Sequence, residues 1–230
     1  MSTASLRPRA ALHASTQARA APANGRARPV PNSASIQTAP ACAARSGSAP
    51  TTTGTPAARS TAEVARSLGE RFVILAGAGN NGGDGLAAAR HLGVQRCTIH
   101  VLAEPDPVKA PDAALQLRIL RAAGVPLVMG ALPDLDAHAG AVWIDALFGT
   151  GLARELTGAS RAWVEAFDRA RGPKLAVDIP SGLHGDTGEV LGAACHADVT
   201  VTFVARKRGM ATPNGRRHCG RIVVAGLGLP

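Results

Sequence analysis

A short apolar run that leads directly into a glycine-rich segment limits what this chain can fold into. Residues 72–76 (FVILA) include β-branched and aromatic side chains and stop at a glycine, which is typical of a buried strand. The following segment 77–85 (GAGNNGGDG) is rich in residues that tolerate positive φ and let a ligand approach the backbone. The pattern becomes helical from Asp84 to Leu92, so we predict an irregular turn followed by a helix that Asp84 caps or starts.

A strand, a glycine-rich turn and a helix N-terminus in this order can bind an anion. Free backbone N–H groups and the positive end of the helix dipole both point into such a turn. Our central hypothesis is therefore that segment 77–85 holds a dinucleotide-like ligand.

The positive charge of the chain is concentrated near its N-terminus. The formal net charge is +9, and residues 1–60 contain seven arginines and no acidic residue. This leaves 18 of the 25 basic residues and all 16 acidic ones in residues 61–230, a net charge near +2. With no tyrosine, four phenylalanines and two tryptophans, that part has few platforms for stacking bases, so we expect no nucleic-acid partner. No apolar run is long enough to span a membrane, so we expect no membrane partner.

Residues 1–60 are rich in Ala, Arg, Pro, Ser and Thr and show no hydrophobic periodicity. Such a segment cannot bury enough apolar surface to offset chain entropy, so we predict a disordered tail. The tail is either dispensable, for example translated upstream sequence, or an organelle transit peptide. The transit-peptide interpretation rests on its composition, which is arginine-rich, serine-rich and acid-free. We expect a cytoplasmic protein, and an organelle location if the tail is a transit peptide.

The four cysteines, at positions 42, 97, 195 and 219, form no Cys-x-x-Cys pair. This favours a reducing compartment. The pairs Cys195-His196 and His218-Cys219 have zinc-binding residue types, but their spacing is not that of a zinc ribbon or finger.

Strand-like and helix-like segments alternate along residues 61–230. Alternation of this kind implies a mostly parallel sheet with right-handed crossovers and helices on both faces, an α/β three-layer αβα sandwich. Besides the segments described above, we predict helices at 61–69, 111–123 and 160–171, and strands at 97–103, 126–129, 141–145, 174–178, 198–203 and 221–225.

Polar residues follow three of the predicted strands. Asn80, Asn81 and Asp84 follow the first strand, Asp145 precedes a Gly-Thr-Gly turn, and Asp178 precedes Pro-Ser-Gly. Ligands of parallel sheets bind outside the carboxyl ends of the strands, so we predict one shared site. For each aspartate alone, the alternative is a turn or helix cap.

Three separated strings resemble the NAD(P)H-hydrate epimerase family, the YjeF N-terminal domain: GNNGGDG at 79–85, DALFGTG at 145–151 and DIPSG at 178–182. Further matches lie at 186–188 and 197–203, and the resemblance covers about residues 73–230. It implies a Rossmann-like fold and epimerisation of the R and S forms of hydrated NADH and NADPH at C6. It also implies a homodimer, one potassium ion per subunit, and a separate stereospecific dehydratase that uses the product.

The resemblance also implies the roles of particular residues. The turn Asn80–Asp84 would form one wall of the nucleotide site, and the loop Gly149–Glu155 the phosphate side, with backbone N–H groups as an oxyanion nest. Asp178 would contact the hydrated nicotinamide, and we predict it as the general acid and base. The full set of predicted substrate contacts is Asn80, Asn81, Gly82, Gly83, Asp84, Gly149, Thr150, Gly151, Leu152, Ala153, Arg154, Glu155 and Asp178.

Asn81, Asp145 and Ser181 match the family's potassium ligands. A hard monovalent cation prefers oxygen donors, and a single carboxylate with neutral oxygens balances one positive charge. Lys207, within the basic run 206–208, either reaches the phosphates of the substrate or belongs to a solvated basic cluster.

The sequence departs from the family pattern near both of its ends. Family members begin with a helical region that closes the site, of which we expect only 61–69 here. The sequence ends about where bifunctional relatives begin their dehydratase domain, so we expect no dehydratase activity from this chain.

A non-catalytic nucleotide-binding or interaction module of the same fold is the alternative function, although the intact potassium ligands and Asp178 favour an enzyme. A dinucleotide dehydrogenase needs an acidic residue at the end of its second strand, where the ribose binds. Here that strand ends at Ala103 and Glu104 comes one position too late, so this function is disfavoured.

Overall fold

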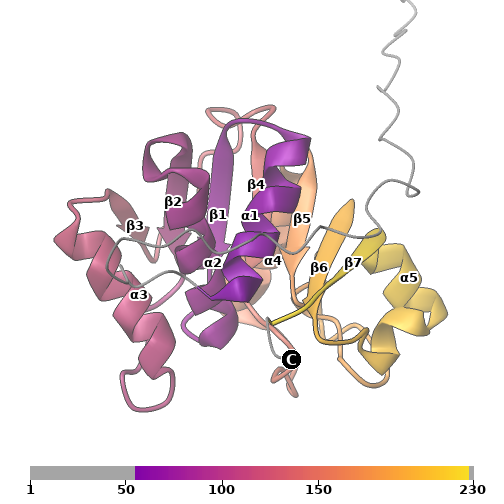
Figure 1. Cartoon of the computed structure of the whole chain (residues 1–230). Coiled ribbons are helices and arrows are strands. Elements are labelled where there is room, and N and C mark those ends of the chain that lie inside the picture. Colours follow the sequence, from indigo (N-terminus) through magenta and orange to yellow (C-terminus); the bar gives the residue numbers. More distant parts are fainter. Residues whose placement is uncertain (1–54, 228–230) are drawn as a thin grey trace, which may run out of the picture. The chain divides into compact units, whose positions relative to one another are not determined.

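A parallel sheet of seven strands forms the centre of the computed structural model, which describes residues 55–227 (Figure 1). The predicted tail up to residue 54 lies outside the described residues. The strand order is β3-β2-β1-β4-β5-β6-β7, and every neighbouring pair is parallel. The strands are β1 (Phe72–Ala76), β2 (Cys97–Val101), β3 (Leu127–Met129), β4 (Val142–Ala146), β5 (Lys174–Val177), β6 (Val199–Phe203) and β7 (Arg221–Ala225).

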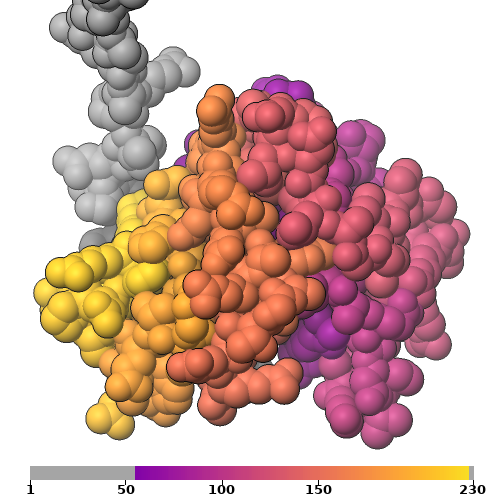
Figure 2. All heavy atoms as spheres, turned by 180° about the vertical axis from the view of Figure 1, so that it is seen from behind, coloured from indigo at the N-terminus to yellow at the C-terminus, as the bar shows by residue number. Residues whose placement is uncertain are grey.

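Helices cover both faces of the sheet, as predicted. The helices are α1 (Pro56–Leu68), α2 (Asn80–Leu92), α3 (Pro111–Ala122), α4 (Gly158–Arg169) and α5 (Pro213–Cys219), with 3-10 turns η1 (Val94–Arg96) and η2 (Arg208–Ala211). Helices α1, α2 and α3 pack on one face, and α4 packs on the other. Figure 2 shows the molecule from behind, where coral and orange atoms from the middle of the chain lie at the centre. The α/β sandwich predicted from the sequence is confirmed.

The central strand β1 shows why an uninterrupted apolar run is needed. Phe72, Ile74 and Ala76 join the core on the α1–α3 side, and Val73 and Leu75 join the core on the α4 side. Successive side chains of a strand point to opposite faces, so a strand with helices on both sides must be apolar at every position. All five residues of β1 are buried.

The start of α2 differs from the prediction. The helix begins at Asn80 with Gly79 as its N-cap, so segment 80–84 is helical, and Asp84 neither caps nor starts the helix. A Cβ on Gly82 would lie 1.9 Å from Gly77 O, and one on Gly83 would lie 2.9 Å from the Cα of Ala113. These glycines are needed because backbones pass close together, whereas the sequence suggested a need for positive φ.

Three other helix assignments also need correction. Helix α1 begins at Pro56, with Thr55 as its N-cap, so the boundary predicted at residue 60 lies within the helix. Helix α4 begins at Gly158 and ends at Arg169, two residues before the predicted positions at each end. Helix α5 was not predicted, although Thr212 followed by Pro213 is a typical helix start.

The cysteines of the described region form neither a disulfide nor a zinc cluster. Cys97, Cys195 and Cys219 are free thiols, and residues 55–227 contain no group of three or more metal-ligating His, Cys, Asp or Glu side chains. The imidazoles of His196 and His218 stack on each other with centroids 3.9 Å apart. Within the same residues, no helix combines the length and apolar character needed to cross a membrane.

Candidate functional site

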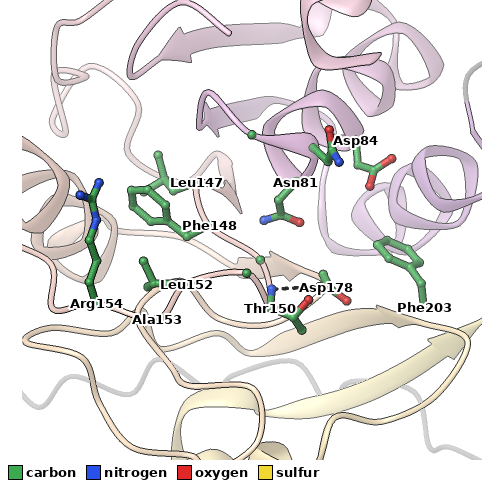
Figure 3. A pocket seen from close by; sticks show the side chains of 14 residues that line it. Asn81, Asp84, Leu147, Phe148, Thr150, Leu152, Ala153, Arg154, Asp178 and Phe203 are labelled. Atoms are coloured by element: carbon green, nitrogen blue, oxygen red, sulfur yellow. Dashed lines mark hydrogen bonds between the residues drawn. The ribbon is translucent and has the colours of Figure 1, made fainter. Parts of the chain in front are cut away.

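A cavity of about 690 Å³ opens at the carboxyl ends of the central strands (Figure 3). This size suits a small-molecule ligand. Four segments contribute: the start of α2, the loop after β4, the end of β5 and the end of β6. The lining residues are Gly79, Asn80, Asn81, Asp84, Leu147, Phe148, Gly149, Thr150, Gly151, Leu152, Ala153, Arg154, Asp178 and Phe203.

The cavity wall contains most of the predicted substrate contacts. Gly82, Gly83 and Glu155 were predicted as contacts but do not line it, and the two glycines instead allow α2 to pack closely. The cavity is also lined by four residues outside the predicted set of contacts, Gly79, Leu147, Phe148 and Phe203. Phe203 ends β6 at the same edge of the sheet, so the strand-end rule could have found it.

Asp178 follows β5 and has a backbone φ of 68°. This left-handed region is uncommon for residues other than glycine, although aspartate and asparagine tolerate it better than most. Oδ2 accepts a hydrogen bond from the backbone N–H of Thr150 at 3.4 Å (Figure 3). Oδ1 lies 2.7 Å from the Lys207 ammonium. The carboxylate therefore lies in the cavity wall, where it can exchange a proton with a ligand.

Lys207 makes a contact that neither interpretation of the sequence included. Its ammonium contacts Asp178 Oδ1, and it also donates to the backbone oxygens of Phe203 at 3.0 Å and Ala205 at 3.5 Å. An ammonium has three hydrogens, so these contacts account for all of its donors. The side chain is only 22% exposed, and thus Lys207 is not part of a solvated cluster.

The beginning of α1 reaches the site through Asp84. The Thr55 hydroxyl donates to Asp84 Oδ1 at 2.9 Å and also accepts from the Ala58 N–H, which caps the helix. Burial raises the pKa of Asp84 above its ordinary value, the Thr55 hydrogen bond lowers it, and the nearby Asp178 carboxylate raises it again. The N-terminal helical cover, which the sequence predicted only from residue 61, is therefore longer and contacts the cavity wall.

Asp145 and Ser181 lie directly beneath the loop after β4, and neither is exposed to solvent. The Ser181 hydroxyl donates to Asp145 Oδ1 at 2.6 Å, and the Ser181 N–H donates to Oδ2 at 2.8 Å. The same hydroxyl accepts from the Phe148 N–H at 2.8 Å. Burial raises the pKa of Asp145, while hydrogen bonds from Ser181, Leu147 and Cys195 lower it.

Comparison with known proteins identifies the family. Residues 51–209 match the family model described as YjeF-related protein N-terminus. The chain belongs to this family. This membership agrees with the resemblance found in the three separated strings.

Two bacterial relatives and one solved structure illustrate the extent of the YjeF-related match. The NAD(P)H-hydrate epimerase of Levilactobacillus brevis is 39% identical over 163 residues, which cover 70% of this chain and 74% of that protein. The bifunctional NAD(P)H-hydrate repair enzyme Nnr of Salinibacter ruber is 39% identical over 176 residues, 70% of this chain and 32% of that protein. The crystal structure of the yeast protein YNL200c has a TM-score of 0.60 at 22% identity, covering 76% of this chain and 78% of that one, which shows a shared fold.

In this YjeF-related chain, Asn81 lies across the loop from the Asp145–Ser181 pair. A Cβ on Gly149 would lie 3.3 Å from the Asn81 Cβ, and the adjacent Phe148 contacts Ser181 through both its N–H and its carbonyl. The Asn81 Nδ2 atom is buried without a hydrogen-bond partner. Turning the Asn81 amide by 180° exchanges its oxygen and its nitrogen. The oxygen then occupies the Nδ2 position, where it can face a cation.

Proposed function

We propose that this protein is an NAD(P)H-hydrate epimerase, which interconverts the R and S forms of hydrated NADH and NADPH at C6. The observation that carries this proposal is the Asp178 carboxylate in the wall of a nucleotide-sized cavity at the end of β5. Relatives that bear this name in Levilactobacillus brevis and Oenococcus oeni are 39% and 36% identical to the chain, which covers 74% and 75% of their lengths.

Asp178 can serve both halves of the reaction. When its carboxyl group is protonated, it gives the proton to the C6 hydroxyl, which leaves as water. The resulting carboxylate then takes a proton from the water that returns to the opposite face, so the proton balance is zero. The Thr150 N–H on Oδ2 orients the carboxyl group within the cavity.

The charges of the cavity support one orientation of the substrate. Asp84 and Asp178 lie together, and Arg154 projects at the other side of the cavity (Figure 3). Among the described lining residues, Arg154 is the one with a cationic side chain. We therefore propose that the hydrated nicotinamide lies at Asp178 and that the phosphates lie toward the loop 149–154, where a guanidinium and backbone N–H groups favour anions.

We also propose that Asn81, Asp145 and Ser181 hold a potassium ion, together with the Phe148 carbonyl oxygen. The donor set fits, because it offers one carboxylate and neutral oxygens and lacks the His and Cys ligands of transition metals. Ser181 has one hydroxyl hydrogen, which the 2.6 Å contact to Asp145 takes, so the Phe148 oxygen 3.1 Å away receives none from it. A bound potassium ion would neutralise the buried Asp145 carboxylate.

The partners of the reaction follow from the same proposal. We propose a homodimer that passes its product to a separate NAD(P)H-hydrate dehydratase in the cytoplasm. The bifunctional repair enzyme of Salinibacter ruber, of which the chain spans 32%, supports a link between this domain and a repair pathway. Light scattering of the purified protein tests the homodimer.

A coupled assay tests the proposed activity. Purified protein is added to (R)-hydrated NADPH with a dehydratase that accepts only the S form, and formation of NADPH is followed by absorbance. The expected result is conversion faster than the spontaneous rate, in proportion to the protein added. The same amount of Asp178→Asn protein is the matched control. No acceleration by folded protein would contradict the epimerase and leave a non-catalytic binding module.

A further inference from the structure

Lys207 contacts Asp178 but does not itself line the cavity. Its ammonium lies 2.7 Å from Asp178 Oδ1. The two side chains are 22% and 15% exposed, so solvent screens the pair only in part. The other two N–H groups of the Lys207 ammonium donate to the carbonyls of Phe203 and Ala205, so none remains for a substrate.

The backbone around this pair is strained at two neighbouring strand ends. Asp178 follows β5 with a φ of 68°, and Val204 follows β6 with a φ of 66°. For a β-branched residue such as Val204, this region is a true outlier. Such strain persists only where the surrounding structure imposes it, and it is concentrated at functional sites.

A tight turn at Val204 ends β6. The Val204 N–H still donates to Ala225 O of β7 at 3.0 Å, and the Ala205 N–H donates to Phe203 O at 2.8 Å across the turn. Lys207 follows three residues later and donates back to the Phe203 oxygen. The turn therefore places the Lys207 ammonium at the carboxyl end of the adjacent strand β5.

We propose that Lys207 is a positioning residue for Asp178. By occupying Oδ1, the ammonium fixes the rotation of the carboxyl group, so that Oδ2 stays near the Thr150 N–H and the cavity. Catalytic groups must be held close to their productive geometry by surrounding contacts. This inference rests on the proposed epimerase function and deepens it.

The first test compares kcat and KM of Lys207→Met with those of wild type. Because Lys207 has no donor for the substrate, we expect kcat to fall by about 10- to 100-fold with little change in KM. Lys207→Arg keeps the positive charge and should recover part of kcat. Arg208→Met is the matched control, since it removes a neighbouring exposed charge, and should retain wild-type kcat. A wild-type kcat in Lys207→Met, a rise in KM alone, no recovery in Lys207→Arg, or an equal loss in Arg208→Met would overturn the proposal.

The second test needs no activity. Urea unfolding of wild type, Lys207→Met, Asp178→Asn and the double variant forms a double-mutant cycle. The proposal expects the two substitutions to be coupled, and additive effects would overturn it. If Lys207→Met does not fold, Lys207→Gln replaces it, because the amide can still donate to the Phe203 and Ala205 carbonyls. If wild type lacks epimerase activity, the proposed function fails, and the cycle alone decides whether Lys207 holds Asp178.

Discussion

The Ser181 hydroxyl lies 2.6 Å from Asp145 Oδ1, joining the segment that follows β5 to the end of β4 across 36 positions of the chain. The Ser181 N–H adds a second bond to Oδ2, and both residues are fully buried. No cationic side chain among the described residues pairs with Asp145. A buried carboxylate of this kind is costly unless a cation or a proton neutralises it.

Asp145→Asn is therefore expected to remove any response of the epimerase rate to potassium. The amide is similar in size to the carboxylate but carries no charge, and its NH₂ group cannot accept from the Ser181 N–H. We expect about 1–3 kcal/mol of lost stability from this mismatch. The measurement is the coupled rate in potassium chloride and in tetramethylammonium chloride at equal ionic strength. Asp136→Asn, an exposed aspartate, is the control, and an undiminished potassium response in Asp145→Asn would disprove the cation site.

Asp178→Asn is expected to lower kcat by about 100-fold or more, because general acid–base catalysis contributes about 10²–10⁴-fold. Asparagine tolerates the φ of 68° at this position, so the variant should fold normally. Steady-state rates and a thermal melt measure the two effects separately. Full activity in a correctly folded variant would show that Asp178 is not the acid or base.

Gly149→Ala is expected to reduce activity with little change in stability. Its Cβ would lie 3.2 Å from Asp178 Oδ2 and 3.3 Å from the Asn81 Cβ, so the methyl group would displace both side chains by a few tenths of an ångström. At Gly151, in the same loop, a Cβ would meet nothing within 4 Å, so Gly151→Ala should cost much less. Assays of both variants at saturating substrate measure the difference. Equal losses would show that contact with Asp178 and Asn81 is not the cause.

The stability of the protein is expected to fall as the pH drops from 7 to 5. Burial lowers the pKa of His100, which is 5% exposed, and that of His218, which is 8% exposed. Below the ordinary histidine pKa of about 6.5, the unfolded chain binds protons that the folded chain does not, so unfolding becomes easier. Urea unfolding at several pH values measures the slope.

His100→Gln supplies the comparison for this pH dependence. Its amide can replace the hydrogen bond that the His100 ring makes to Ala131 O, and it does not titrate. Stability should therefore fall less steeply with decreasing pH in the variant than in wild type. Contributions from other groups, including Asp145, cancel in this comparison. Identical slopes would show that His100 does not cause the loss.

The sequence by itself determined the sheet and the edge at which the site lies. A strand covered by helices on both faces must be apolar throughout, so residues 72–76 could be assigned with their observed bounds. Parallel strands end at one edge, and polar residues after three of them therefore indicated a shared cavity, which Asn81 and Asp178 do line. Both inferences depend on local patterns alone.

Only the tertiary structure decided how that edge becomes a site. Helix α2 begins at Asn80 despite its glycines, because Gly82 and Gly83 let it pack against Gly77 and α3, an effect that helix propensity does not contain. The contact between Lys207 and Asp178 depends on a left-handed turn at Val204, a residue that local preference would place in an extended strand. Contacts between distant segments impose such conformations, and therefore short-range sequence patterns do not reveal them.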